Sequence, residues 1–463
     1  SAVGKGNSVE AIDVPALVAG YRGDEAVAAG EAFDPTPANL EARTERVKLA
    51  DGMTLALMPK KTRGEVVRFS LRLRFGDEAS LRGTAPTGAL TGSMLELGTR
   101  ERTRQQFEDA LDALRAKVSL SGGSTQASAS GETVRANLAG VLKLVAEAMK
   151  APAFDAGEFD KLVRANLASI EKARTDPQAI AGREFNRHLK PWPAGDVRET
   201  PTFEESIARL RAAKLDDLKA FHAKFYGTTN AELAIVGDFD PAEARALAER
   251  LFGSWTSPSP YARVADPFRA TEPVVRTIET PDKANAVLVG GMTIPMWDRS
   301  PDYPALLVAE RILGGATESR MFSVVRTKLG LSYGVGTWLD EGRLDESSTF
   351  GVYAIYAPEN LGKVRAAVAA EIAQALDRGY TGEEVENAKR ALLEERKSAR
   401  AQDATLAGAL VSQAFLGRTW AFSGDLDRAI ASVSVEQADA ALRKYLKPAG
   451  LATFYAGDFA KKP

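Results

Sequence analysis

Two polar side chains, Arg326 and Tyr333, have types and a spacing that could hold a peptide. They lie seven residues apart in FSVVRTKLGLSYGVGTWLD (residues 322–340), where a helical pattern changes to an extended one punctuated by glycine. A guanidinium and a phenol both donate hydrogen bonds, so the pair could hold carbonyl oxygens or stabilise a developing oxyanion. The structural alternative is an arginine that interacts favourably with a helix C-terminus, and a tyrosine packed in a strand.

The residues around this pair carry a family resemblance. Upstream, AERILGGATESRMF predicts an amphipathic helix, a glycine break and a short second helix. With R-x-x-L-G-L-S-Y, it resembles the substrate-clamping segment of the pitrilysin/insulinase family of zinc peptidases, the inverzincins, which include the mitochondrial processing peptidases. In that family the Arg/Tyr pair lies in the half without the metal and reaches into the partner's zinc site. The resemblance covers about residues 43–460 and implies that Arg326 and Tyr333 bind substrate.

The same resemblance identifies a degenerate metal motif. A peptidase of this family places H-x-x-E-H on a helix, where two histidines ligate zinc and the glutamate activates water. The matching segment here is TGALTGSMLELGT, which has Ala89, Gly92 and Ser93 at those three positions. The distal glutamate ligand would fall near Ser169. Because none of these residues can replace its counterpart, we expect no zinc in this chain and no peptidase activity from the chain alone.

The resemblance therefore implies the non-catalytic, substrate-binding half of a bipartite zinc metallopeptidase. Its partner would carry H-x-x-E-H and the zinc, either as a separate subunit of a heterodimer or as the N-terminal half of one precursor. The substrates would be extended peptides or unfolded segments. The rival interpretation is a scaffold protein of the same fold without a peptidase role, as in family relatives of a respiratory complex. Exported bacterial relatives favour the periplasm as the compartment, with the cytoplasm as the alternative.

Composition limits other functions. The chain has 463 residues, of which 60 are Lys or Arg and 62 are Asp or Glu. This balance predicts no electrostatic attraction to nucleic acid or to an anionic membrane. No apolar run approaches the ~18 residues that span a bilayer. The absence of cysteine excludes disulfides and thiolate metal sites.

The remaining candidate residues are few. His188 and His222, the only histidines, lie 34 residues apart and form no recognisable ligand spacing, so we expect one structural and one surface histidine. Glu96 is expected to be a solvated helix carboxylate. Ser332 fits G-x-S-x-G, but a nucleophile elbow runs from strand to helix, whereas this segment is predicted to run from helix to strand.

Two separate matches reveal an internal duplication. FDAGEFDKLVRANL, from Phe154, parallels YTGEEVENAKRALL, from Tyr380, at an offset of 226 residues. A second pair of similar segments ends at Phe239 and Phe459, at an offset of 220 residues. Matches in the same order at nearly the same offset predict two copies of one α/β unit of about 200 residues.

Local patterns indicate the fold class and the boundaries. RVKLADGMTLALMPKK predicts a hairpin around Asp51-Gly52, VVRFSLRLRFG a half-buried strand, and Thr103 a helix N-cap. We predict an α+β protein in which each repeat has an antiparallel-rich sheet packed with helices. The predicted parts are an arm or interdomain linker at 1–42, a first repeat with the degenerate motif at 43–256, a Pro-rich linker at 257–270, and a second repeat with the Arg/Tyr pair at 271–463. The arm, with no Met start, is expected to be a connector from a precursor.

Overall fold

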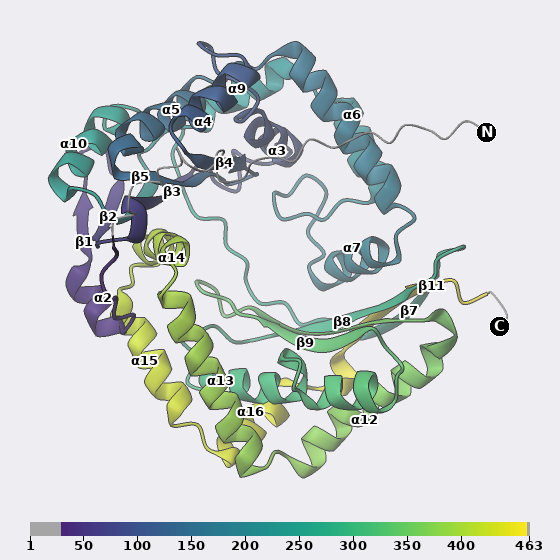
Figure 1. The fold of residues 1–463 in the computed structure, drawn as a ribbon. Helices are drawn as coiled ribbons and strands as arrows, with labels where there is room; N and C mark the ends of the chain where they lie inside the picture. Colours follow the sequence, from purple (N-terminus) through teal and green to yellow (C-terminus); the bar gives the residue numbers. More distant parts are fainter. Residues whose placement is uncertain (1–28, 461–463) are drawn as a thin grey trace, which may run out of the picture.

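Two mixed sheets, one in each half of the chain, organise the molecule. A computed structural model describes residues 29–460 (Figure 1). The first sheet has the strand order β1-β2-β6-β3-β5-β4. Its strands are β1 (Glu45–Lys48), β2 (Thr54–Pro59), β3 (Val66–Arg74), β4 (Lys117–Gly122), β5 (Gln126–Val134) and β6 (Ala231–Gly237). The predicted hairpin at Asp51-Gly52 is confirmed, because β1 and β2 pair antiparallel around it and Gly52 takes a left-handed φ of 103°.

The second sheet repeats the first. It has the strand order β7-β11-β8-β10-β9. Its strands are β7 (Val274–Glu279), β8 (Ala286–Ile294), β9 (Gly334–Asp340), β10 (Ser348–Tyr356) and β11 (Ala452–Gly457). Apart from the additional β1, the two orders correspond strand for strand. The one parallel pair of each sheet, β2 with β6 and β7 with β11, also corresponds. The predicted tandem α+β duplication is confirmed.

The helices follow the same duplication. In the first half they are α3 (Ala85–Met94), α4 (Arg104–Ala113), α5 (Leu138–Lys150), α6 (Ala156–Ala173), α7 (Pro177–Leu189), α8 (Phe203–Arg211), α9 (Leu215–Phe225) and α10 (Pro241–Phe252). In the second half they are α11 (Tyr303–Glu310), η3 (Arg311–Gly315), η4 (Phe322–Lys328), α12 (Leu361–Arg378), α13 (Gly382–Arg400), α14 (Asp403–Leu416), α15 (Trp420–Ala431) and α16 (Val435–Tyr445). Short 3₁₀ turns occur at η1 (Arg63–Glu65), η2 (Arg135–Asn137), η5 (Pro358–Asn360) and η6 (Pro448–Gly450). None of these described helices is long and apolar enough to cross a bilayer.

Local capping explains several helix starts. Thr103 caps α4 in a capping box with Gln106, as predicted from the sequence. Asp176 caps α7, whose first residue is Pro177, so the preceding helix ends before that proline. Thr381 forms a further capping box at the start of α13.

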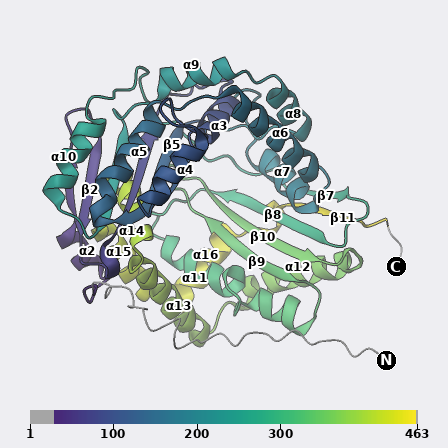
Figure 2. The same cartoon turned by 45° about the horizontal axis from the view of Figure 1, so that its top comes forward.

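One helix of each half packs on the sheet of the other half. Helix α14 lies on the first sheet, where Leu406, Leu410 and Val411 pack against apolar residues of β2 and β6. Helix α7 lies on the second sheet, where Phe185 packs against Phe454 of β11. Figures 1 and 2 show α7 and α14 on the sides of the sheets that face the opposite half, with most other helices outside. The linear boundary at 257–270 therefore separates the sheets but not the helices that cover them.

The described part of the predicted arm is more ordered than expected. Residues 1–28 lie outside the described residues, but α2 (Pro37–Arg43) is a helix with Leu40 fully buried. The Glu41 carboxylate accepts the backbone N–H of Trp420 at 2.9 Å, at the start of α15. This segment shows little sequence periodicity, so the helix was not predicted. A seven-residue helix depends mainly on tertiary packing, which the local sequence does not show.

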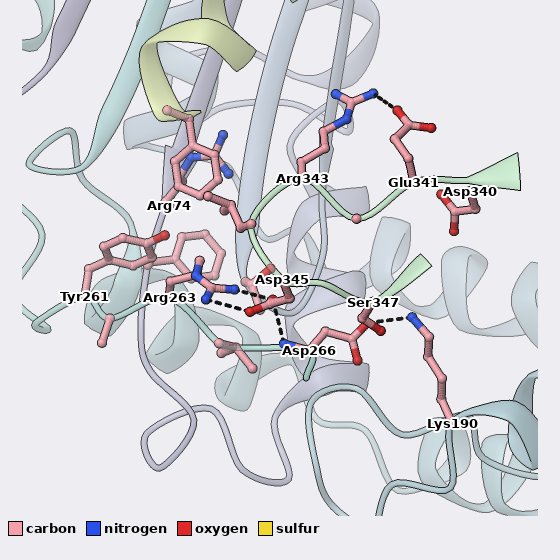
Figure 3. A pocket seen from close by; sticks show the side chains of 17 residues that line it. Arg74, Lys190, Tyr261, Arg263, Asp266, Asp340, Glu341, Arg343, Asp345 and Ser347 are labelled. Atoms are coloured by element: carbon pink, nitrogen blue, oxygen red, sulfur yellow. Dashed lines mark hydrogen bonds and ion pairs between the residues drawn. The ribbon is translucent and has the colours of Figure 1, made fainter. Parts of the chain in front are cut away.

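The Pro-rich linker has no helix or strand, and contacts hold it to both halves. The N–H of Ala262 donates to the carbonyl of Gly76 at 3.0 Å in the first half. On the other side, the Arg263 guanidinium pairs with Asp345 at 2.5 Å, in the loop between β9 and β10. Figure 3 shows the Arg263–Asp345 pair beside a cavity that residues of both halves line. The linker is therefore a fixed part of the interface.

Because of the exchanged helices, we expect the two halves to unfold together. Substituting Leu410→Ala, which is fully buried against the opposite half's sheet, should cost about 2–5 kcal/mol. Scanning calorimetry should show one transition at a lower temperature, with the exposed Thr405→Ala as the control on the same helix. Two resolved transitions would contradict this coupling.

Candidate functional site

Arg326 and Tyr333 flank the turn between η4 and β9. The segment η4 is a π-helix, a rare conformation that is frequent at functional sites. It ends with the N–H of Leu329 bound to the carbonyl of Val324 at 2.9 Å, and Gly330 then takes a left-handed φ of 62°. The N–H of Tyr333 donates to Ile355 on β10 at 2.8 Å. The predicted change from helix to strand is confirmed.

Both side chains of the pair are exposed. The Tyr333 side chain is 63% exposed, so it is not packed in the sheet as the structural alternative required. The Arg326 guanidinium lies over the ring of Phe322, with its carbon 4.6 Å from the centroid. Within residues 29–460, neither side chain makes a hydrogen bond or an ion pair with another side chain. The donors of both residues are therefore free for a ligand.

The helix with the degenerate motif, α3, is closed against the first sheet. Ala89 and Ser93 are exposed on one side of it, and the Ser93 hydroxyl donates to the Ala89 carbonyl at 3.1 Å. Gly92 is buried, and a Cβ there would lie 2.3 Å from the Cα of Gly122 on β4. A glutamate at position 92 would require the backbones to separate. Ser169 is exposed on α6.

These residues do not fit a zinc site. Ala89, Gly92, Ser93 and Ser169 offer no carboxylate, imidazole or thiolate, the usual ligands of zinc. Across residues 29–460, no group of three or more His, Cys, Asp and Glu side chains could hold a metal ion. The degenerate motif therefore has a structural role, the close contact of α3 with β4.

The other candidates have structural partners. The Nε2 atom of His188 lies 2.6 Å from the Glu272 carbonyl, and that of His222 lies 2.8 Å from the Met149 carbonyl. His188 is half-buried rather than a free surface residue. Burial lowers the pKa of His222, which favours the neutral ring. Glu96 is not simply solvated as expected, because its carboxylate accepts the N–H of Leu120 on β4 at 2.5 Å.

Sequence reasoning missed a cavity of about 340 Å³ between the halves. Arg74 lines this cavity (Figure 3). Its guanidinium lies 3.4 Å from the ring centroid of Phe415 on α14 and binds Glu232 at 3.1 Å. Burial raises the pKa of the Glu232 carboxyl to about 7, although Arg74 opposes this shift. Lys190 pairs with Asp266 in the wall, so the cavity is largely an ion-paired interface. The alternating arginines of β3 indicate a polar face of the strand. They do not indicate that α14 packs opposite that face.

Comparisons with known proteins agree with this architecture. Residues 212–392 match the peptidase M16 inactive domain, and this range includes Arg326 and Tyr333. An uncharacterized zinc protease of Rickettsia bellii is 26% identical over 299 residues, covering 63% of this chain and 68% of the relative. The uncharacterized zinc protease YmxG of Bacillus subtilis is 24% identical over 40% of this chain and 43% of its own length.

Residues 212–392 are therefore similar to an M16 inactive domain. The resemblance to the pitrilysin/insulinase peptidases is thereby confirmed.

Solved structures share the fold of this chain. The peptidase M16 inactive domain from Pseudomonas fluorescens superposes with a TM-score of 0.78 at 24% identity, covering 89% of this chain and 97% of that structure. The periplasmic protease PqqL from Escherichia coli superposes with a TM-score of 0.73 at 13% identity, covering 93% of this chain but 46% of PqqL. The described fold therefore corresponds to about half of that longer protease.

The contact between Gly92 and Gly122 leads to a stability prediction. Gly92→Ala should cost about 1–3 kcal/mol, because the added methyl group must separate two backbones. The matched control is Gly182→Ala in α7, where a Cβ meets nothing within 4 Å, and this change should stabilise by about 0.5–1 kcal/mol through helix propensity. Urea denaturation measures both. Equal effects of the two substitutions would contradict the close contact of α3 with β4.

The raised pKa of Glu232 leads to a pH prediction. The folded protein binds this proton more tightly than the unfolded chain, whose carboxyl has the ordinary value of 4.5. The stabilisation is fully present below 4.5 and is lost as the pH rises through about 7. The free energy of unfolding should therefore fall with pH across this interval in the wild type relative to Glu232→Gln, as measured by urea denaturation. The exposed Glu394→Gln is the control, and parallel pH curves for wild type and Glu232→Gln would contradict the shift.

Proposed function

We propose that this chain is the non-catalytic, substrate-binding half of a bipartite zinc metallopeptidase that cleaves peptides or unfolded segments. The observation that carries the proposal is the exposed, unpaired state of Arg326 and Tyr333 beside a π-helical turn. The match to an inactive domain of a zinc peptidase family supports it. The first half lacks the donors of the metal motif, so the chemistry would require a partner.

The two side chains would bind and orient the substrate. The Arg326 guanidinium and the Tyr333 hydroxyl would donate hydrogen bonds to a backbone carbonyl of the peptide. As the carbonyl oxygen gains negative charge, these bonds strengthen, which lowers the barrier. Phe322 supports the guanidinium from one side and limits its freedom before the substrate arrives. Neither side chain would compete with the peptide carbonyl for the zinc of the partner.

The partner would be a half that carries H-x-x-E-H. Zinc held there would supply an activated water molecule for hydrolysis. Leu329 and Tyr333 are exposed by 52% and 63%, so they present apolar surface beside Arg326 that docking could bury. The fit of this chain to 46% of PqqL supports a two-half arrangement, either as a heterodimer or within one precursor. The periplasm stays the proposed compartment, and cell fractionation tests it.

A scaffold role within the same fold is the second candidate. The contact of Gly92 with Gly122 favours it, because this contact gives the first half a purely structural use of the motif helix. A scaffold has no need of an exposed arginine and tyrosine without partners. Gentle purification from the source cell distinguishes the two, since recovery with a zinc-containing partner of similar size supports the peptidase half and recovery without one supports the scaffold.

Kinetics of the assembled peptidase provide the direct test. Arg326→Ala or Tyr333→Phe should lower turnover about 10²-fold, as loss of an oxyanion donor does. The melting temperature should not change, because both side chains are exposed. Arg250→Ala, an exposed arginine on α10, is the matched control. If both substitutions leave peptide cleavage at the wild-type rate, the pair is structural and the assignment fails.

A further inference from the structure

The inner face of the first sheet has a polar floor that the proposed function does not use. Side chains alternate along a strand, so β3 directs its odd-numbered residues, such as Phe69 and Leu71, into the core and its even-numbered residues to the opposite face. That opposite face continues across β5 and β4 in matching register. We call its five hydroxyl side chains the serine floor: Ser70, Ser119, Ser121, Ser128 and Ser130.

Ser70, Ser119 and Ser130 of the serine floor line a cavity of about 480 Å³, and Arg72 lies outside this lining. Helix α14 borders this cavity with Ala404 and Gly408, which leave room beside the sheet. At one end, Glu132 pairs with both Arg68 and Lys117. The volume is in the range of ordinary ligand pockets. The cavity is separate from the ion-paired interface around Arg74.

Arg72 lies in the next row of the same face. It is the Cα partner of Ser128 across the sheet, and Ser70 lies two residues away along β3. Of the three arginines on this face of β3, Arg68 pairs with Glu132 and Arg74 with Glu232. Glu232 is the Cα partner of Arg72 on β6, but Arg72 makes no ion pair within the described residues, and its buried Nε atom has no acceptor.

This arrangement leaves the charge of Arg72 only partly compensated, by Glu232 on the neighbouring strand β6. Burial and the neighbouring Arg74 lower the pKa of its guanidinium, although Glu232 opposes this shift. Because an arginine remains protonated, a bound anion would offset the remaining charge and could supply the acceptor that the Nε atom lacks. A carboxylate matches the planar donor geometry of a guanidinium in a paired hydrogen-bond arrangement.

We infer that Arg72 and the serine floor form a carboxylate-binding subsite for an extended peptide. The carboxylate would bind the Arg72 guanidinium, and hydroxyls of the floor would donate to the peptide beyond it. Rows on the sheet repeat every two residues, about 7 Å, which matches the same-side spacing of an extended peptide. The carboxylate comes from a C-terminus or from an acidic side chain. This inference rests on the proposed function, since it concerns the same peptide substrate.

Direct binding to the intact chain tests the subsite. Three fluorescent peptides of one neutral sequence would be compared by anisotropy: one with a free C-terminal carboxylate, one amidated, and one amidated with an internal glutamate. We expect at least one carboxylate peptide to bind about tenfold more tightly than the neutral amide. The stronger of the two identifies the source of the carboxylate. Equal affinity of all three, or no binding by any, overturns the inference.

Substitutions locate the carboxylate and separate binding from stability. Arg72→Met should remove the carboxylate preference and leave the amide unaffected, while Arg72→Lys should retain part of it. The melting temperature of Arg72→Met should stay equal or rise, because an unpaired, partly buried charge is removed. Arg250→Met is the surface control. A lower melting temperature with unchanged carboxylate affinity would show that Arg72 is only structural.

The outcome is separable from that of the proposed function. If Arg72→Met keeps the carboxylate preference while Arg326→Ala impairs cleavage by the assembled peptidase, the subsite is wrong and the proposed function stands. If the carboxylate preference depends on Arg72 but substitutions of Arg326 and Tyr333 have no effect on cleavage, the subsite stands and the proposed function is wrong.

Discussion

The exchange of α7 and α14 between the halves is the constraint on which the rest of the structure depends. Each sheet has a core face covered by its own helices, and part of its second face would expose apolar side chains to water. Leu406 and Leu410 cover that surface on the first sheet, and Phe185 does so on the second. Burial of these side chains supplies the main non-directional stabilisation between the halves. The linker and its ion pairs then fix the orientation that burial alone does not specify.

The duplication explains why the two halves differ at equivalent places. Gly92 approaches Gly122 where α3 meets β4, and Gly314 approaches Thr337 where η3 meets β9, with a Cβ on Gly314 lying 2.6 Å from the Thr337 nitrogen. Both contacts bring a helix close to the edge strand of its sheet. In the second half the chain then forms the π-helix with the exposed Arg326, whereas in the first half Glu96 binds the edge amide of Leu120. In the first repeat, Glu96 thus satisfies a backbone N–H of the edge strand. In the second repeat, the side-chain donors of Arg326 and Tyr333 stay unpaired within residues 29–460.

The sequence was sufficient to predict those features of the fold that depend on local chemistry or on internal repetition. The Asp51-Gly52 turn, the Thr103 cap and the duplicated segments follow from backbone preferences and from similarity within the chain. The exchange could not be predicted in this way. The apolar positions of α7, among them Phe185, show that the helix is buried but not which sheet buries it. In the same way, the sequence shows that Gly92 replaces a functional glutamate, whereas its contact with Gly122 joins residues distant along the chain and appears only in three dimensions.

The exchange also determines which part of the first sheet stays open. Helix α14 covers β2, β6 and part of β3, and the inner faces of β5 and β4 extend beyond it. Hydration of that open surface accounts for small polar residues such as Ser119 and Ser130, which need no further explanation. It does not account for Arg72, because an arginine selected only for solubility would extend its guanidinium into water or pair with a nearby carboxylate, as Arg68 does with Glu132. A half-buried guanidinium without an ion pair, and with an Nε atom that has no acceptor, destabilises the isolated chain, and such a cost persists where a ligand compensates it.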